Sequence, residues 1–234
     1  MTTALSAIVG LRLQLYRRFL LGEMVLDVCV PVAFTLFALG ANPCAGDKAG
    51  PAAFILSSTM ALARGPAFVL TAERLDGTQR LLSSAGVTRR QYLTANGLTA
   101  AYFAIFPAIA YVAVQLAAGP LRLPSPNGMA ALGLFACCCH GWSLLLGGAF
   151  DTFGRLTLAV NLLLFAVFSL SPVLYPAERV PDAITSLVDQ LPGTVTIGLA
   201  MAAAPVTDFA ALATLAAWAL LSLAIGYRLF RWET

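Results

Sequence analysis

The chain has 234 residues, of which 59% are hydrophobic and 11% are charged, and its formal net charge is +3. A soluble domain usually covers its surface with about a quarter of charged residues, and this chain has less than half of that share. The composition therefore excludes an ordinary soluble domain and predicts that lipid covers most of the surface.

Residues 1–20 place apolar side chains at helical spacing, which predicts an amphipathic helix lying in the cytoplasmic interface. The stripe consists of Leu5, Ile8, Val9, Leu13, Tyr16 and Leu20. Arg12 falls within it, so a frayed tail before the first span is the alternative. A signal peptide would have a short basic region directly before its apolar run, whereas residues 1–21 are a long amphipathic segment, so we expect the first span to be retained.

The rest of the chain divides into six apolar windows of about the length that a bilayer-spanning helix needs. They lack the alternating polarity of transmembrane β-strands and predict an all-α integral membrane protein with six transmembrane helices. The predicted spans are 24–41, 51–71, 92–118, 129–150, 156–175 and 208–230.

The basic residues indicate the orientation, because cytoplasmic loops carry the excess of Lys and Arg. One side of the predicted topology carries Arg12, Arg17, Arg18, Arg74, Arg80, Arg89, Arg90, Arg155, Arg228 and Arg231. The other side carries Lys48, Arg122 and Arg179. Both termini are therefore expected in the cytoplasm, as an even number of crossings also requires.

Charged residues within the first two spans need an explanation, because an unpaired charge near the bilayer centre costs roughly 2.5–3.5 kcal/mol or more. Asp27 and Arg64 each lie about 10 Å from the cytoplasmic ends of two antiparallel spans, at a rise of about 1.5 Å per residue. We expect an ion pair between them, or else an Arg64 side chain that reaches the interface alone.

Three cysteines and the single histidine are consecutive at Cys137, Cys138, Cys139 and His140, which raises the question of a metal or haem site. Adjacent residues on a helix point about 100° apart and cannot converge on one ion. We therefore predict small packing residues and no metal site.

The segment 73–90, ERLDGTQRLLSSAGVTRR, carries six of the 25 charged side chains of the chain, counted as 14 basic and 11 acidic residues. Its apolar residues Leu75, Leu81, Leu82 and Val87 would give a short helix an edge that can dock in a groove of a partner. An ordinary charged cytoplasmic loop is the alternative.

This segment resembles the cytoplasmic signature of ABC-2 type transporter permeases, through Glu73, Gly77, Thr78, Leu81, Leu82 and the Arg89–Arg90 pair. In that family the segment is a coupling helix that sits in a cleft of an ATP-binding subunit. The resemblance implies that an ATPase contacts Glu73, Asp76, Gly77, Thr78, Leu81, Leu82, Arg89 and Arg90.

A second resemblance to these permeases follows the fifth span, in SPVLYPAERVPDAI and the later Leu191–Thr194. It implies a re-entrant outer hairpin over 176–207, with an outer gate at Pro172, Tyr175, Pro176, Pro181 and Pro192. The prolines alone predict interrupted helices, which at membrane depth must line protein or a cavity. A plain outer loop is the alternative.

The chain has no GxxxxGK[ST] motif, and its only lysine is Lys48, so we expect no cofactor on this chain. The family resemblance implies two copies of an ABC ATP-binding subunit that carry ATP and Mg, and a second permease chain, identical or homologous. We expect membrane lipid as a further partner, and no nucleic acid.

The resemblance thus implies a non-catalytic permease subunit of an ABC exporter in a prokaryotic cytoplasmic membrane. It would move a hydrophobic or amphiphilic drug-, lipid- or glycan-like substrate out of the cytoplasm by alternating access. Three alternatives stay open, namely a haem-exporter-like permease of cytochrome maturation, a membrane subunit of an importer and a membrane-embedded enzyme. The SPVLYP region favours the drug and polysaccharide exporters.

Overall fold

The computed structural model describes residues 6–14, 22, 24–41, 43–119, 121–172, 175, 180–202 and 208–232. Within these residues all regular structure is helical. Residues 6–14 are helical, and a π-helical turn, Val25–Cys29, leads into α2 (Val30–Ala41). A 3₁₀ turn (Pro43–Lys48), α3 (Ala49–Ser58), a second π-helical turn (Thr59–Arg64) and α4 (Gly65–Leu75) follow. The remaining helices are α5 (Thr78–Ser84), α6 (Arg89–Phe103), α7 (Ile105–Ala118), α8 (Pro126–Ala149), α9 (Phe153–Leu170), α10 (Asp182–Val188), α11 (Pro192–Met201) and α12 (Phe209–Leu229).

Five continuous helices of the described residues are long and apolar enough to span a membrane. They are Gly46–Leu75, Arg89–Ala118, Pro126–Ala149, Phe153–Leu170 and Phe209–Leu229. The all-helical class is confirmed, and each of these helices overlaps one of the last five predicted windows. The first window contains an apolar helix, Val25–Gly40, that is shorter than 18 residues.

The fifth predicted window is displaced along the sequence relative to its helix. The prediction was 156–175, whereas α9 begins at Phe153 and ends at Leu170. Thr152 caps the start, since its hydroxyl accepts a hydrogen bond from Arg155 N, and Ser171 is extended. Pro172 disfavours a helical conformation at Ser171, which explains why the helix stops five residues early.

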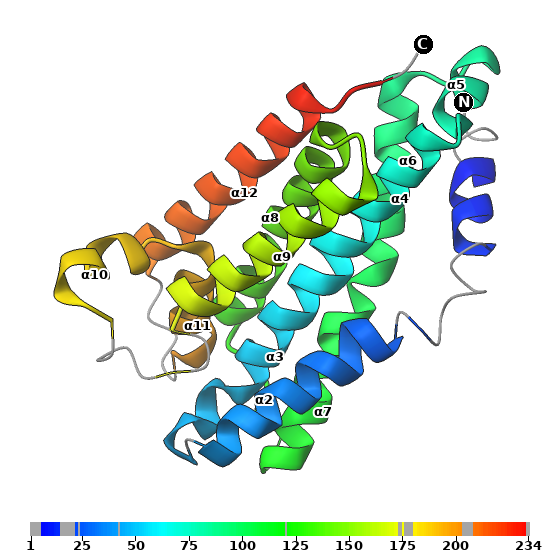
Figure 1. Cartoon of the computed structure of the whole chain (residues 1–234). Coiled ribbons are helices and arrows are strands. Elements are labelled where there is room, and N and C mark those ends of the chain that lie inside the picture. The colour runs from blue at the N-terminus through cyan, green and yellow to red at the C-terminus, as the bar shows by residue number, and fades with distance from the viewer. Residues whose placement is uncertain are drawn as a thin grey trace.

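The centre of the bundle is α8, which packs against α4, α11 and α12. Figure 1 shows α8, α9 and α12 running alongside one another. At Gly141 of α8 an added Cβ would lie 2.5 Å from Ser222 C, and at Gly226 of α12 it would lie 2.6 Å from Gly141 O. The two helices therefore touch backbone to backbone, as small residues allow between helices in a membrane.

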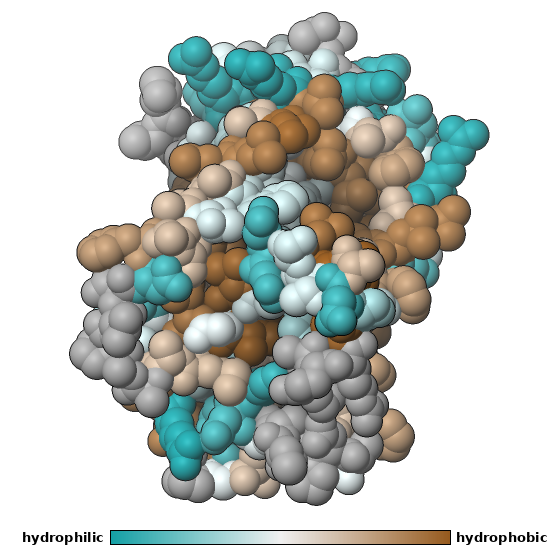
Figure 2. Space-filling view, turned by 90° about the vertical axis from the view of Figure 1, so that its left-hand side faces the viewer, coloured by the Kyte–Doolittle hydropathy of each residue, from teal (hydrophilic) through white to brown (hydrophobic). Residues whose placement is uncertain are grey.

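The two ends of the bundle differ in structure and in polarity. Figure 1 shows α5 near the end of α12 at one end, and α10 and α11 toward the other. In Figure 2 hydrophilic residues gather at the upper end, and smaller hydrophilic groups lie among hydrophobic residues across the middle and lower part of this face. Large apolar side chains are exposed on the outer helices, including Phe37, Leu158, Phe165 and Leu220. Such a surface suits lipid rather than water.

Candidate functional site

The segment that follows α4 folds back on itself to form what we call the α5 hairpin, residues 73–90. After α4 ends at Leu75, Gly77 adopts φ 81°, a conformation that glycine takes without strain. The Asp76 carboxylate accepts a hydrogen bond from Thr78 N at 2.9 Å, which satisfies a free amide at the start of α5. The Asp-Gly-Thr sequence thus produces a tight turn into a short helix.

The return from α5 into α6 is also defined by local chemistry. Gly86 has φ 83° and allows the chain to leave α5. Thr88 and Gln91 then form a capping box at the start of α6. The hairpin is consequently a structured element at both of its turns.

A buried ion pair ties the hairpin to the N-terminal helix. Arg12 Nε donates to Glu73 Oε1 at 2.9 Å, and Arg12 Nη2 donates to Glu73 Oε2 at 2.5 Å. Arg12 is 2% exposed, and its Nη1 also donates to Asn96 Oδ1 of α6 at 3.1 Å. This fork-like geometry is the strongest form of an arginine–carboxylate contact.

Tyr92 extends this network beneath α5. Its hydroxyl donates to Glu73 Oε2, and the Arg12 guanidinium lies 4.7 Å from the centre of its ring. Gln79 of α5 donates to the Tyr92 hydroxyl and to Leu70 O, each at 3.2 Å. The N-terminal helix, α4, α5 and α6 therefore meet in one buried polar network.

Arg74 connects the hairpin to the end of α8. This buried side chain donates to Gly148 O at 3.1 Å and to Phe150 O, and it lies 3.7 Å from Asp151 Oδ1. Carbonyl groups at a helix C-terminus have no intrahelical partner and carry partial negative charge. Arg74 therefore supplies the donors that the end of α8 needs.

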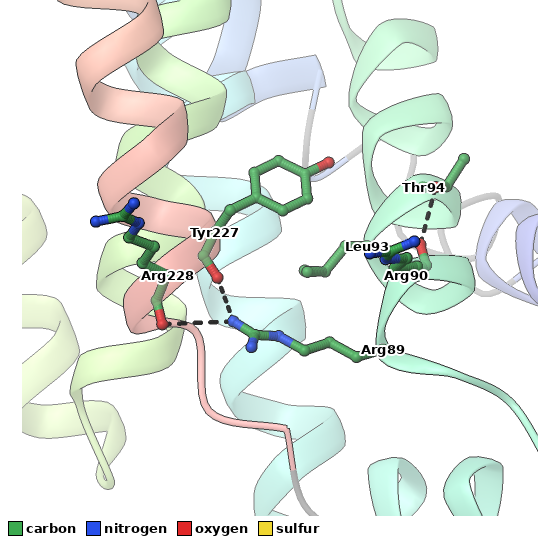
Figure 3. A pocket seen from close by; sticks show the side chains of 6 residues that line it. All are labelled: Arg89, Arg90, Leu93, Thr94, Tyr227 and Arg228. Atoms are coloured by element: carbon green, nitrogen blue, oxygen red, sulfur yellow. Dashed lines mark hydrogen bonds between the residues drawn. The ribbon is translucent and has the colours of Figure 1, made fainter.

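Arg89 makes the equivalent connection to α12. Its Nη2 donates to Tyr227 O and, at 3.4 Å, to Arg228 O, as Figure 3 shows. The three connections join the short hairpin to the N-terminal helix, to α8 and to α12.

The outward side of the hairpin carries two exposed leucines. Leu75 is 50% exposed and Leu81 is 70% exposed. Leu82 is half-buried, and Val87 is buried in the cluster beneath α5. The predicted apolar edge of four residues is therefore divided, with two facing out and two packed inside.

The eight residues for which we expected an ATPase contact divide in the same way. Asp76, Leu81 and Arg90 are exposed, while Gly77, Thr78 and Leu82 are partly exposed. Glu73 and Arg89 instead hold the hairpin to the rest of the chain through the contacts described above. Their side chains are engaged within the chain, and their contact with an ATPase stays a prediction.

At the opposite end, the proline-rich region contains α10 and α11. Pro181 directly precedes α10, and Pro192 is at the start of α11, where a missing amide hydrogen is tolerated. The Tyr175 hydroxyl donates to Ser169 O at 2.8 Å, and Pro172 follows the end of α9. Pro176 lies outside the described residues.

Helix α11 is largely buried, which separates it from an ordinary surface loop. Val195 and Leu199 pack with Leu215 and Ala219 of α12 and with Ala131 and Cys138 of α8. A Cβ at Gly193 would lie 2.7 Å from Ser171 Oγ, so α11 also approaches the end of α9 closely.

Asp27 and Arg64 lie together as their sequence positions suggested. Arg64 Nη2 donates to Asp27 Oδ1 at 3.1 Å, and the Asp27 side chain is 2% exposed. Each residue is in one of the two π-helical turns. Such π-helical turns are frequently found at functional sites.

The cysteine run does not converge on one point. Cys139 packs in the large central cluster, Cys138 packs against α11 and α12, and Cys137 is exposed. Cys137 and His140 line a cavity of about 330 Å³ whose other walls are apolar. His140 Nε2 has no hydrogen-bond partner among the described residues. In the described part of the chain, no group of three or more His, Cys, Asp or Glu side chains could hold a metal ion.

Comparison with known proteins identified no relative of this chain. No family model matches the chain, and no significant match was found among curated proteins or solved structures.

Proposed function

We propose that the chain is the membrane-spanning permease subunit of an ABC exporter of the ABC-2 type. The observation that carries this proposal is the α5 hairpin, which presents Leu75 and Leu81 outward while its base is bonded to three other parts of the chain. A short exposed helix with an apolar edge is suited to docking in a groove of a partner protein. The partner would be an ATPase subunit, present in two copies with ATP and Mg.

The bonds at the base of the hairpin support a mechanical role. A displacement of α5 would act on the N-terminal helix through Glu73, on α8 through Arg74 and on α12 through Arg89. Coupling between distant sites is carried by such contiguous bonded and packed elements. Closure of the ATPase subunits around ATP would thereby move the spanning helices.

The distribution of charge supports six crossings with the α5 end in the cytoplasm. Four arginines lie at the α5 end. The side chains of Arg74, Arg89 and Arg231 contact the ends of α8 and α12 or Asp151, and Arg228 is in the last turn of α12. The opposite end contains the exposed Arg122–Asp47 pair, at 2.7 Å. An excess of Arg at one end is typical of the cytoplasmic side, which would place both termini there. The membrane would be the cytoplasmic membrane of a prokaryote.

An apolar cavity and the broken helices at the far end support transport of a hydrophobic or amphiphilic substrate. The His140 cavity is lined by small and apolar residues of α6, α8 and α12 and by Leu62. Together with a second permease chain, identical or homologous, these walls would form a pathway with alternating access. Pro172, Tyr175, Pro181 and Pro192 would belong to its outer gate and re-entrant region.

Copurification and a coupling variant test the proposal. The chain is expected to copurify with an ATPase whose activity in vesicles rises when both are present. Leu81→Glu places a charge on the outward face of α5 and should abolish this stimulation while membrane insertion stays normal. Leu123→Glu is the matched control, since Leu123 is 76% exposed in the turn between α7 and α8.

Three results would contradict the proposal. Equal stimulation of the ATPase activity by the Leu81→Glu variant and the Leu123→Glu control would show that α5 does not dock through Leu81. Activity of the purified chain on a substrate without any ATPase would favour a membrane-embedded enzyme. ATP-driven flux into the cytoplasmic side would favour an importer.

A further inference from the structure

A surface hollow of about 500 Å³ lies between the first turns of α6 and the last turn of α12. Its walls are formed by Arg89, Arg90, Leu93, Thr94, Tyr227 and Arg228, as Figure 3 shows. None of these six lining residues is acidic. The hollow is at the base of the α5 hairpin, so it is separate from the outward face that carries Leu81.

The hollow has unused capacity to bind an anion. Arg89 contributes positive charge to the wall, while its Nη2 bonds the end of α12 and its Nε is buried. Arg90 is exposed and forms no ion pair with a described residue. In Figure 3 the Arg228 guanidinium lies on the side of α12 away from Arg89, so Arg89 and Arg90 are the two cationic groups that matter.

The apolar part of the wall favours an amphiphile over a free ion. Leu93 and the Tyr227 ring lie between the two helices in Figure 3. Tyr227 is 39% exposed and Leu229 is 58% exposed, at the end of an apolar helix long enough to span a membrane. Tyrosine at such a helix end is typical of the level of the lipid headgroups.

We propose that this hollow binds the phosphate of an anionic phospholipid, with the exposed Arg90 as the phosphate ligand, the charge of Arg89 beside it, and Tyr227 against the apolar part of the lipid. Basic pockets between spanning helices on the cytoplasmic side are suited to such headgroups. Arginine binds phosphate well, because its donors form a planar fork. A bound lipid would contact both α6 and α12 next to the end of the α5 hairpin.

Lipid titration of the purified full-length chain, followed by native mass spectrometry, tests the site. Phosphatidylglycerol should bind more tightly than phosphatidylcholine, and Arg90→Gln should weaken the phosphatidylglycerol affinity about fivefold. Arg90→Lys should restore much of the affinity, because it retains the charge. Arg155→Gln is the matched control, since Arg155 is exposed in the first turn of α9, outside the hollow.

Four outcomes would overturn the proposal. Equal binding of phosphatidylcholine would show that charge is not recognised, and equal weakening by Arg155→Gln would indicate general surface charge. Competition by inorganic phosphate at the same concentration as the lipid would assign the site to a free anion. Loss of ATPase binding in Arg90→Gln with unchanged lipid affinity would assign the hollow to the protein interface. Because lipid binding is measured without an ATPase, its result is independent of the proposed transport function.

Discussion

Arg12 and Glu73 are 61 residues apart in the sequence and form a two-point ion pair in the interior, with N–O distances of 2.9 and 2.5 Å. The pair joins the N-terminal helix to the base of the α5 hairpin. Because Tyr92 and Asn96 also bond to it, removal of either charge would leave several buried polar groups without partners.

Glu73→Gln is expected to lower the free energy of unfolding by roughly 3–5 kcal/mol, because it leaves the Arg12 charge buried without a counter-ion. Thermal unfolding in detergent measures the change. Asp47→Asn serves as the control, since Asp47 and its partner Arg122 are 71% and 70% exposed, and should change stability by about 0–1 kcal/mol. Similar losses for both variants would contradict a special role of the buried pair.

The Asp27–Arg64 pair predicts a compensating double variant. Asp27→Asn and Arg64→Leu should each reduce the melting temperature and the yield of folded protein, because each removes the counter-charge of the other side chain. The double variant should recover part of the loss, with a coupling of about 0.5–3 kcal/mol in a double-mutant cycle. Strictly additive effects would show that the two side chains do not stabilise each other.

Gly77 predicts a purely conformational effect in the hairpin turn. A Cβ at this position would meet nothing within 4 Å, so the cost of Gly77→Val comes from its positive φ alone. That cost is about 1–2 kcal/mol, and it should reduce ATPase stimulation by shifting the turn. Gly77→Asn is the control, because asparagine adopts this conformation more readily. Gly77→Pro should abolish stimulation, because proline cannot adopt a positive φ.

The seam between α8 and α12 predicts opposite effects for two glycines of α8. Gly141→Ala should destabilise the protein by about 1–3 kcal/mol, since the new methyl group would collide with the backbone of Ser222 and Leu223. Gly133→Ala should stabilise it by up to about 1 kcal/mol, because nothing lies within 4 Å and alanine favours a helix. Thermal unfolding of both variants measures the two changes. Destabilisation by both would indicate a general preference for glycine in α8 instead of a close backbone contact at Gly141.

The helical class and most of the spans could be predicted because lipid imposes a strict rule on composition and length. The predicted end of α9 is wrong, because the sequence stays apolar beyond the helix although Pro172 stops it at Leu170. Apolar composition predicts which segments can lie in lipid, whereas the residue at which a helix ends depends on backbone sterics.

The contacts of the candidate site could be predicted only in part. Asp27 and Arg64 are both charged residues within apolar windows, and helix rise places them at the same depth. Arg12 is likewise a charged residue within an apolar stripe, which indicates that it needs a partner. The identity of that partner depends on how distant helices pack. The same is true of Arg74 and Arg89: arginine commonly bonds helix C-termini, but the sequence does not say which helix end it meets.

The backbone contact between Gly141 and Gly226 also limits how this protein can change shape. Two helices that meet without intervening side chains have little room to slide or tilt, because packed interiors shift between discrete arrangements rather than deforming gradually. Helices α8 and α12 would therefore move together as one rigid body. Relative motion would be left to helices with fewer buried contacts, such as α9, of which only 11% is buried.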